Sequence, residues 1–148
     1  MYTVIPNHSA VQDFAHARRK AFWRDIVSHL TGTENRLRSF DQIRQELPLR
    51  GQHYRGLEIV ALDHIVGSEG RSHDFDRGFF PRQDHTQARW VSVDQAYYED
   101  KPLPPIELIK VGAMYFVRDG HHRVSVARLR GQAFIDAFVV EFEVAVAG

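Results

Sequence analysis

The sequence predicts an α+β domain built around a small mixed β-sheet packed with helices. Apolar residues return at helical spacing near the N-terminus, whereas runs of β-branched and aromatic residues recur in the second half of the chain. Glycine and proline separate these segments at lengths typical of strands and helices mixed in one fold. The 148 residues are enough for a single domain with a sizeable core.

Two helices are predicted in an N-terminal layer that covers residues 1–50. The first begins at the capping box Ser9–Gln12 and continues to about Leu30, with apolar side chains at helical spacing. The second begins at the capping box Ser39–Gln42 and ends before a proline. We interpret this layer as a lid or packing addition to a core that covers residues 57–144.

The core is predicted to open with a strand and turn at residues 57–66, after a loop at residues 49–54. A long loop at residues 67–82 follows, and it contains three glycines, three arginines and three phenylalanines. Long loops in compact domains are often functional, although phenylalanines also dock such loops on the body of a domain. The loop also carries four groups suited to metal binding or proton transfer: Glu69, His73, Asp74 and Asp76.

Residues 87–93 are predicted to form a short strand or turn around Trp90. Ser92 is then expected to cap a helix that ends near Asp100. The prolines at residues 101–105 predict an extended segment after this helix.

A β-hairpin is predicted at residues 106–118, with its turn at Gly112–Ala113. The last strand is predicted at residues 134–144, where alternate positions share one face of the sheet. The positions on one such face are Phe138, Val140, Phe142 and Val144.

Composition excludes several classes of protein. The chain has no cysteine, which excludes disulfides, a thiolate nucleophile and a zinc–thiolate site. Lysine plus arginine equals aspartate plus glutamate, at 19 each, so no overall charge attracts nucleic acid. The basic cluster Arg18–Lys20 and Arg24 on the first helix is either a solvated helix face or a local nucleic-acid patch. No apolar run reaches the length of a membrane span, so we expect a cytoplasmic protein without membrane contact.

The segment Met114–Gly131 carries the clearest functional signal. A strand turns at Asp119–Gly120 into a helix with Arg123 in its first turn, and Gly131 closes that helix. Backbone N–H groups at a helix start lack intrahelical partners, and the helix dipole is positive there. Together with an arginine, they favour a bound anion, so the pattern predicts a phosphate-binding turn. Alternatively, Asp119 simply caps the helix.

The turn Asp119-Gly-His-His-Arg123 resembles the signature of the ParB/sulfiredoxin superfamily, and with its flanks the resemblance covers residues 57–144. Members carry Gly-Glu-Arg-Arg, Gly-Gly-Cys-His-Arg or Asp-Gly-His/Gln-x-Arg at this turn, which holds nucleotide phosphates. The resemblance implies a bound nucleotide such as ATP, ADP or CTP. Because Arg123 stands at the start of the helix after Asp-Gly, we expect that Arg123→Ala abolishes this binding but leaves the fold intact. Sulfiredoxin activity itself is excluded, because His121 stands where its cysteine would be. The expected binding residues are Gly120, His121, His122, Arg123 and Arg82.

The expected activity is Mg²⁺-dependent phosphoryl transfer or nucleotide hydrolysis. Glu69 and Asp119 are the candidates for contact with Mg²⁺, or for a general base that activates the hydroxyl group of a small substrate. Arg71 or Arg82 would add positive charge beside the transferred group. In relatives that phosphorylate free serine, a loop glutamate after the first strand is the base, and Glu69 has a comparable place.

Other functions remain open at this stage. Some members of the superfamily are described as nucleases, and the same carboxylates with a divalent metal would suit that reaction, although zero net charge and the lack of a DNA-binding motif disfavour it. A nucleotide-sensing module without turnover is a further alternative. A metal centre formed by His73, Asp74 and Asp119 with one histidine of the turn is another. A homodimer is compatible with the sequence.

Overall fold

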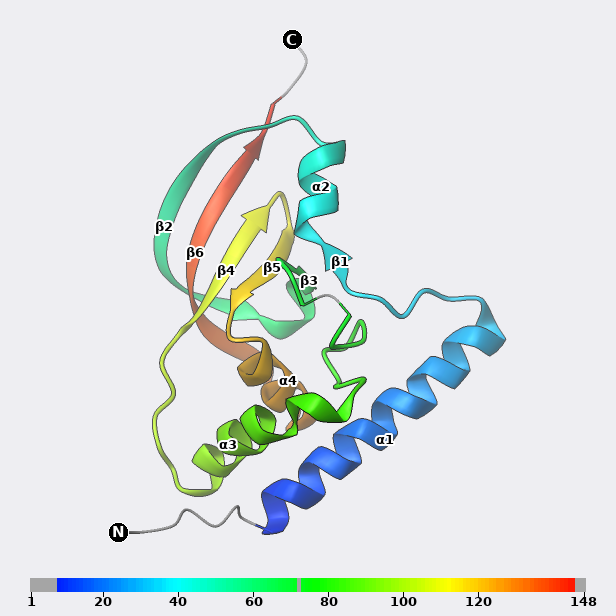
Figure 1. Ribbon diagram of the computed structural model, residues 1–148. Helices are drawn as coiled ribbons and strands as arrows, with labels where there is room; N and C mark the ends of the chain where they lie inside the picture. The colour runs from blue at the N-terminus through cyan, green and yellow to red at the C-terminus, as the bar shows by residue number, and fades with distance from the viewer. Residues whose placement is uncertain (1–7, 72, 146–148) are drawn as a thin grey trace.

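The computed structural model describes residues 8–71 and 73–145. Within them the chain forms one six-stranded mixed sheet and four α-helices, so the predicted α+β class is confirmed (Figure 1). The elements are α1 (His8–Thr31), β1 (Arg38–Ser39), α2 (Phe40–Glu46), β2 (Leu49–Ala61), β3 (Ile65–Ser68), α3 (Gln87–Tyr98), β4 (Ile106–Val111), β5 (Met114–Asp119), α4 (His121–Leu129) and β6 (Phe134–Val144).

The strands are ordered β1-β3-β5-β4-β6-β2. β4 and β5 form the predicted hairpin, β2 lies antiparallel to β6, and β3 lies parallel to β5. Because parallel strands end at the same edge of a sheet, the segments that follow β3 and β5 begin side by side. Ser68 pairs with Val117, and the N–H of Glu69 donates to the carbonyl of Val117 at 2.9 Å. This pairing places the long loop beside the turn that opens α4.

Side chains on both faces of the sheet are buried. On one face, Leu108 and Val117 pack with Val124 of α4. On the opposite face, Phe40 of α2 packs against Phe116, with ring centroids 5.8 Å apart. α1 and α3 complete the helical side of the molecule, where Phe14, Trp90 and Val126 form a separate buried cluster (Figure 1). No helix in the described part of the chain has the length and apolar character needed to cross a membrane.

The prediction of a loop at residues 49–54 is wrong, because β2 begins at Leu49 and pairs with β6 along its whole length. The polar side chains in this part of β2 are exposed on both faces of the strand, so the sequence does not show the alternation of apolar and polar residues that marks a half-buried strand. Backbone pairing holds this half of the strand instead. The register shifts near Gly51 and Gly56, both of which have positive φ, as in a β-bulge.

The strand or turn predicted around Trp90 is also wrong, because α3 begins at Gln87 and Ser92 lies inside it. Trp90 is fully buried, packs edge-on against Phe14 and donates from Nε1 to Ser125 Oγ at 2.8 Å. This packing overrides the strand propensity of tryptophan.

The two predicted capping boxes have different outcomes. α1 begins at His8, so Ser9 lies in the first turn and not at the cap. At α2 the N-cap is confirmed, because Ser39 Oγ accepts from the N–H of Gln42 at 3.4 Å, whereas the side chain of Gln42 donates to Glu46 at 3.1 Å. The closing glycine of α4 is confirmed as well, since Gly131 has φ +72°.

Candidate phosphate-binding site

A cavity of about 510 Å³ lies where β5 passes into α4, between that turn, the start of the long loop and α3. It brings together nearly all the residues that the sequence singled out. These are Glu69, Arg71, Asp119, Gly120, His121, His122 and Arg123. Arg82 is not among its lining residues, because its guanidinium lies 3.7 Å from Asp25 on α1.

Gly120 sets the geometry of the turn. Its φ is +107°, and a Cβ at this position would lie 2.4 Å from Cγ2 of Ile106, so a side chain has neither the backbone conformation nor the space. The first intrahelical bond of α4 runs from the N–H of Val124 to the carbonyl of Gly120 at 3.0 Å. The N–H groups of residues 121–123 therefore precede the helical ladder, at the positive end of the helix dipole.

Arg123 braces the turn. Its guanidinium donates to the carbonyls of Pro104 and Pro105 at 2.7 and 3.2 Å, and to Oδ2 of Asp119 at 3.0 Å. Three of its donor contacts are thus satisfied within the chain, which the sequence did not predict. Asp119 serves this ion pair and does not cap α4, whose N-cap is Gly120.

Glu69 is held by Arg118, the last residue but one of β5. Nε and Nη2 of Arg118 reach the two carboxylate oxygens at 3.2 and 3.4 Å, which is a bidentate pair. Arg118 lies in the segment that carries the signature, but sequence reasoning missed it. Its position just before the turn was the available signal.

His121 joins the loop to the helix. Its Nε2 lies 2.5 Å from Ser68 Oγ, and the Ser68 hydroxyl donates to the carbonyl of Gly70, so Nε2 is the donor to Oγ. The ring also stacks on Phe75, with an interplanar angle of 16°. Burial, reinforced by the charge of Arg71, lowers the pKa of His121 to about 4, so the imidazole is neutral at pH 7.

His122 lines the cavity together with Arg71 and Arg89. Nη1 of Arg71 lies 3.4 Å from its Nε2, and because arginine is only a donor, the ring proton is on Nδ1. Within the described residues, Nδ1 is buried and has no hydrogen-bond partner. Burial lowers the pKa of His122 to about 4, with further lowering from the charges of Arg71 and Arg89.

Arg71 and Arg89 are the cations of the cavity with no carboxylate within ion-pair distance among the described residues. Both side chains also line an adjoining cavity of about 490 Å³, with His122 between the two cavities. Arg71 has φ +43°, a rare conformation for a residue other than glycine. Arg89 was missed because its segment was predicted as a strand or turn.

The rest of the long loop is fastened to α1. The buried carboxylate of Asp76 accepts from the N–H groups of Gly78 and Phe80 at 2.8 and 3.1 Å and from Nε of Arg24 at 3.0 Å. Phe75, Phe79 and Phe80 are buried, so they dock the loop on the body of the domain. The N-terminal layer therefore holds in place the loop that carries Arg71.

The described residues contain no group of three or more histidine or acidic side chains placed to hold a metal ion. The centre that the sequence offered from His73, Asp74 and Asp119 is therefore not formed by them. Asp74 contacts His85 instead, at 3.4 Å.

No family model matches the chain, and no curated protein matches it. Among solved structures, the crystal structure of sulfiredoxin from Arabidopsis thaliana is similar to it, with 17% identity over 59% of this chain and 86% of that chain and a TM-score of 0.44. A likeness this distant carries no argument about function.

Proposed function

We propose that this cavity binds the phosphate groups of a nucleotide, in a domain of the ParB/sulfiredoxin type. The observation that carries the proposal is the pair of unmatched cations, Arg71 and Arg89, beside the open N–H groups of α4. Arg118 balances Glu69 and Arg123 balances Asp119, and both histidines are neutral at pH 7. The cavity therefore keeps an excess of positive charge that suits a ligand with more than one negative charge.

Two anchoring places support a polyphosphate over a single phosphate. One phosphate would accept from the N–H groups at the start of α4. The next would lie between Arg71 and Arg89, on the side of His122. A nucleoside diphosphate or triphosphate such as ADP, ATP or CTP would occupy both places, whereas inorganic phosphate would occupy one.

We further propose that the domain turns over the bound nucleotide. Glu69 would accept the proton of an attacking water molecule or of a small hydroxyl-bearing substrate, and Arg71 would neutralise the transferred phosphoryl group. Both candidate carboxylates, Glu69 and Asp119, are already paired with arginines. They fit Mg²⁺ only together with ligand phosphates, which supply the missing oxygen atoms.

The test is a thermal-shift titration with ATP, ADP, CTP and inorganic phosphate, each with and without Mg²⁺. Arg71→Ala and Arg89→Ala, at exposed positions, should each weaken nucleotide binding by roughly 10-fold to 100-fold, as expected for loss of a charge-assisted hydrogen bond. Arg50→Ala removes an exposed arginine of β2 outside the cavity and should bind as the wild type does. Unchanged affinity in both cavity variants would refute the site.

Product assays with nucleotide and with an oligonucleotide, run on the same proteins, separate the possible activities. If the domain turns nucleotide over, Glu69→Gln should bind it but release no product. Binding by the wild type without any product would identify a sensing module. Metal-dependent cleavage of an oligonucleotide, lost in Glu69→Gln, would support a nuclease instead.

A further inference from the structure

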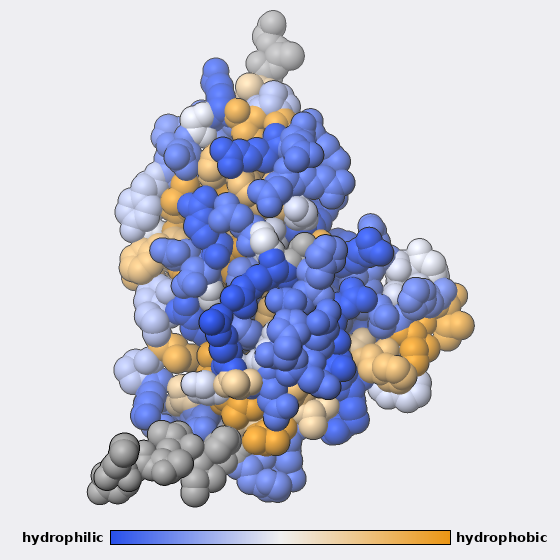
Figure 2. Space-filling model, in the orientation of Figure 1, coloured by the Kyte–Doolittle hydropathy of each residue, from blue (hydrophilic) through white to orange (hydrophobic). Residues whose placement is uncertain are grey.

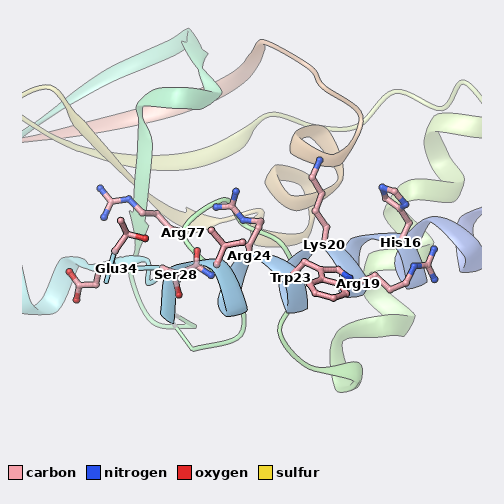
Figure 3. Close-up of a pocket in the computed structure, with 11 residues that line it drawn as sticks. His16, Arg19, Lys20, Trp23, Arg24, Ser28, Glu34 and Arg77 are labelled. Carbon is pink, nitrogen blue, oxygen red and sulfur yellow. The ribbon is translucent and has the colours of Figure 1, made fainter. Parts of the chain in front are cut away.

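A second and larger cavity, of about 720 Å³, lies along α1, away from the turn that opens α4. Its walls come from α1, from residues 33–35 and from Arg77 of the long loop (Figure 3). The four basic residues of the α1 cluster differ in their contacts. Arg18 and Arg24 form ion pairs with Asp84 and Asp76 at 2.9 and 3.0 Å. Arg19, Lys20 and Arg24 line the cavity, and of these Arg19 and Lys20 are exposed.

The cavity combines exposed cations with an exposed aromatic ring. Within the described residues, Arg19, Lys20 and Arg77 have no carboxylate within ion-pair distance, and Glu34 is the acidic residue of the lining. Trp23 is 61% exposed, so much of its indole ring is open to solvent, and its ring meets that of Phe22 at an interplanar angle of 77°. Figure 3 shows Trp23 and Lys20 near the middle of this stretch, with Arg77 towards one end and Arg19 towards the other.

Asn35 adds a polar group to the wall. It is nine-tenths buried, and its side-chain Nδ2 has no hydrogen-bond partner in the part of the chain that the structure describes. A buried amide donor without a partner is costly, and a ligand that accepts a hydrogen bond near it would remove that cost.

We propose that this cavity binds a segment of single-stranded nucleic acid, with a base stacked on Trp23 and the backbone phosphates on Arg19, Lys20 and Arg77. Proteins that bind single strands combine a positively charged groove with aromatic stacking platforms. Lys20 and Trp23 lie three residues apart on one face of the helix, and Val27 extends that face by another turn. Figure 3 shows Lys20 between Arg77 and Arg19 along this stretch, and cations spread in this way suit a strand with several phosphates better than one free nucleotide.

An acidic amphipathic peptide is the competing partner, because it would also meet cations and an apolar patch. Figure 2 shows apolar side chains at the end of α1 that stands away from the sheet. Leu30, 82% exposed, is the most exposed large apolar side chain among the described residues, but it does not line the cavity. The charges and the unpartnered amide gather around Trp23 instead, so the observations favour the nucleic acid.

The experiment is a fluorescence-anisotropy titration of the full chain into labelled single-stranded oligonucleotides of about 12 residues, DNA and RNA, with a duplex and an acidic peptide for comparison. Three phosphate contacts predict that the logarithm of the binding constant falls with the logarithm of the salt concentration with a slope of about −2. Trp90 is fully buried, so quenching of tryptophan emission on binding should come from Trp23 and disappear in Trp23→Phe.

The variants decide the assignment. Trp23→Ala should weaken binding by about 10-fold or more, and Trp23→Phe much less, because phenylalanine still stacks. The double variant Arg19→Ala/Arg77→Ala should lower the salt slope by about 1.4. Leu30→Ala and Arg50→Ala, outside this cavity and outside the proposed phosphate site, should bind as the wild type does. Absence of binding, a wild-type affinity in Trp23→Ala, or tighter binding of the acidic peptide would overturn the proposal.

Discussion

Replacing Gly120 by alanine tests whether the turn into α4 requires glycine for two separate reasons. The first reason is the backbone: a residue with a side chain at positive φ costs about 1–2 kcal/mol, and φ is +107° here. The second is space, because the added methyl group would lie 2.4 Å from Cγ2 and 2.8 Å from Cβ of Ile106. Overpacking of this kind costs roughly 1–3 kcal/mol, so Gly120→Ala should lower the unfolding free energy by about 2–5 kcal/mol.

Gly131→Ala is the matched control. Gly131 also has positive φ, +72°, but a Cβ there would meet nothing within 4 Å. Its cost should be the backbone part alone, about 1–2 kcal/mol. At roughly 2–4 °C per kcal/mol for a chain of this size, the melting temperature should fall by about 4–20 °C in Gly120→Ala and about 2–8 °C in Gly131→Ala.

The assay is urea unfolding followed by circular dichroism, with melting curves as a second measurement. A double variant with Ile106→Ala removes Cγ2, so Gly120→Ala should cost less in that background than in the wild type. Equal costs for the two glycine variants, with no coupling to Ile106, would show that close packing does not set the choice of residue at this turn.

Two further predictions concern the packing of α3. Burial, with a hydrogen bond that protonated Asp94 donates to Asp13, raises the pKa of Asp94 to about 7. Between pH 4 and pH 7 the folded state therefore holds more protons than the unfolded state, and this contribution to stability is lost as pH rises. As pH rises over this range, the unfolding free energy of Asp94→Asn should therefore increase relative to that of the wild type. A pH-independent difference between the two would contradict this prediction. Trp90→Phe should cost about 1–3 kcal/mol in urea unfolding, because it leaves buried Ser125 without its donor, and less in a Ser125→Ala background.

Sequence reasoning located the elements whose signals are local. The hairpin, its turn at Gly112, the last strand and the helix closed by Gly131 each depend on residues within a few positions of one another. The first half of β2 and the start of α3 could not be read in this way. One is held by backbone pairing to a strand nearly 90 residues later, and the other by packing of Trp90 on α1 and α4.

The candidate site was predicted as a set of residues but not as a set of contacts. The resemblance of the turn was enough to bring Glu69, Arg71 and the turn together, since both segments follow parallel strands. It could not show which arginine is already satisfied, because the partners of Arg123 include carbonyls of the proline segment before β4. Partner atoms far along the chain leave no periodic or local signal.

The pairing of charges decides which arginines can serve a ligand. An arginine that already donates to a carboxylate and to two carbonyls, as Arg123 does, gains little from a phosphate unless it gives up those bonds. Among the described residues, Arg71 and Arg89 form no ion pair, and the contact of Arg71 with Nε2 of His122 is a long one, at 3.4 Å. The turn thus supplies the N–H groups and the shape, while the loop and α3 supply the charge. This division explains how a chain with zero net charge can hold a positive site, and it makes Arg89, outside the signature, the more informative residue to change.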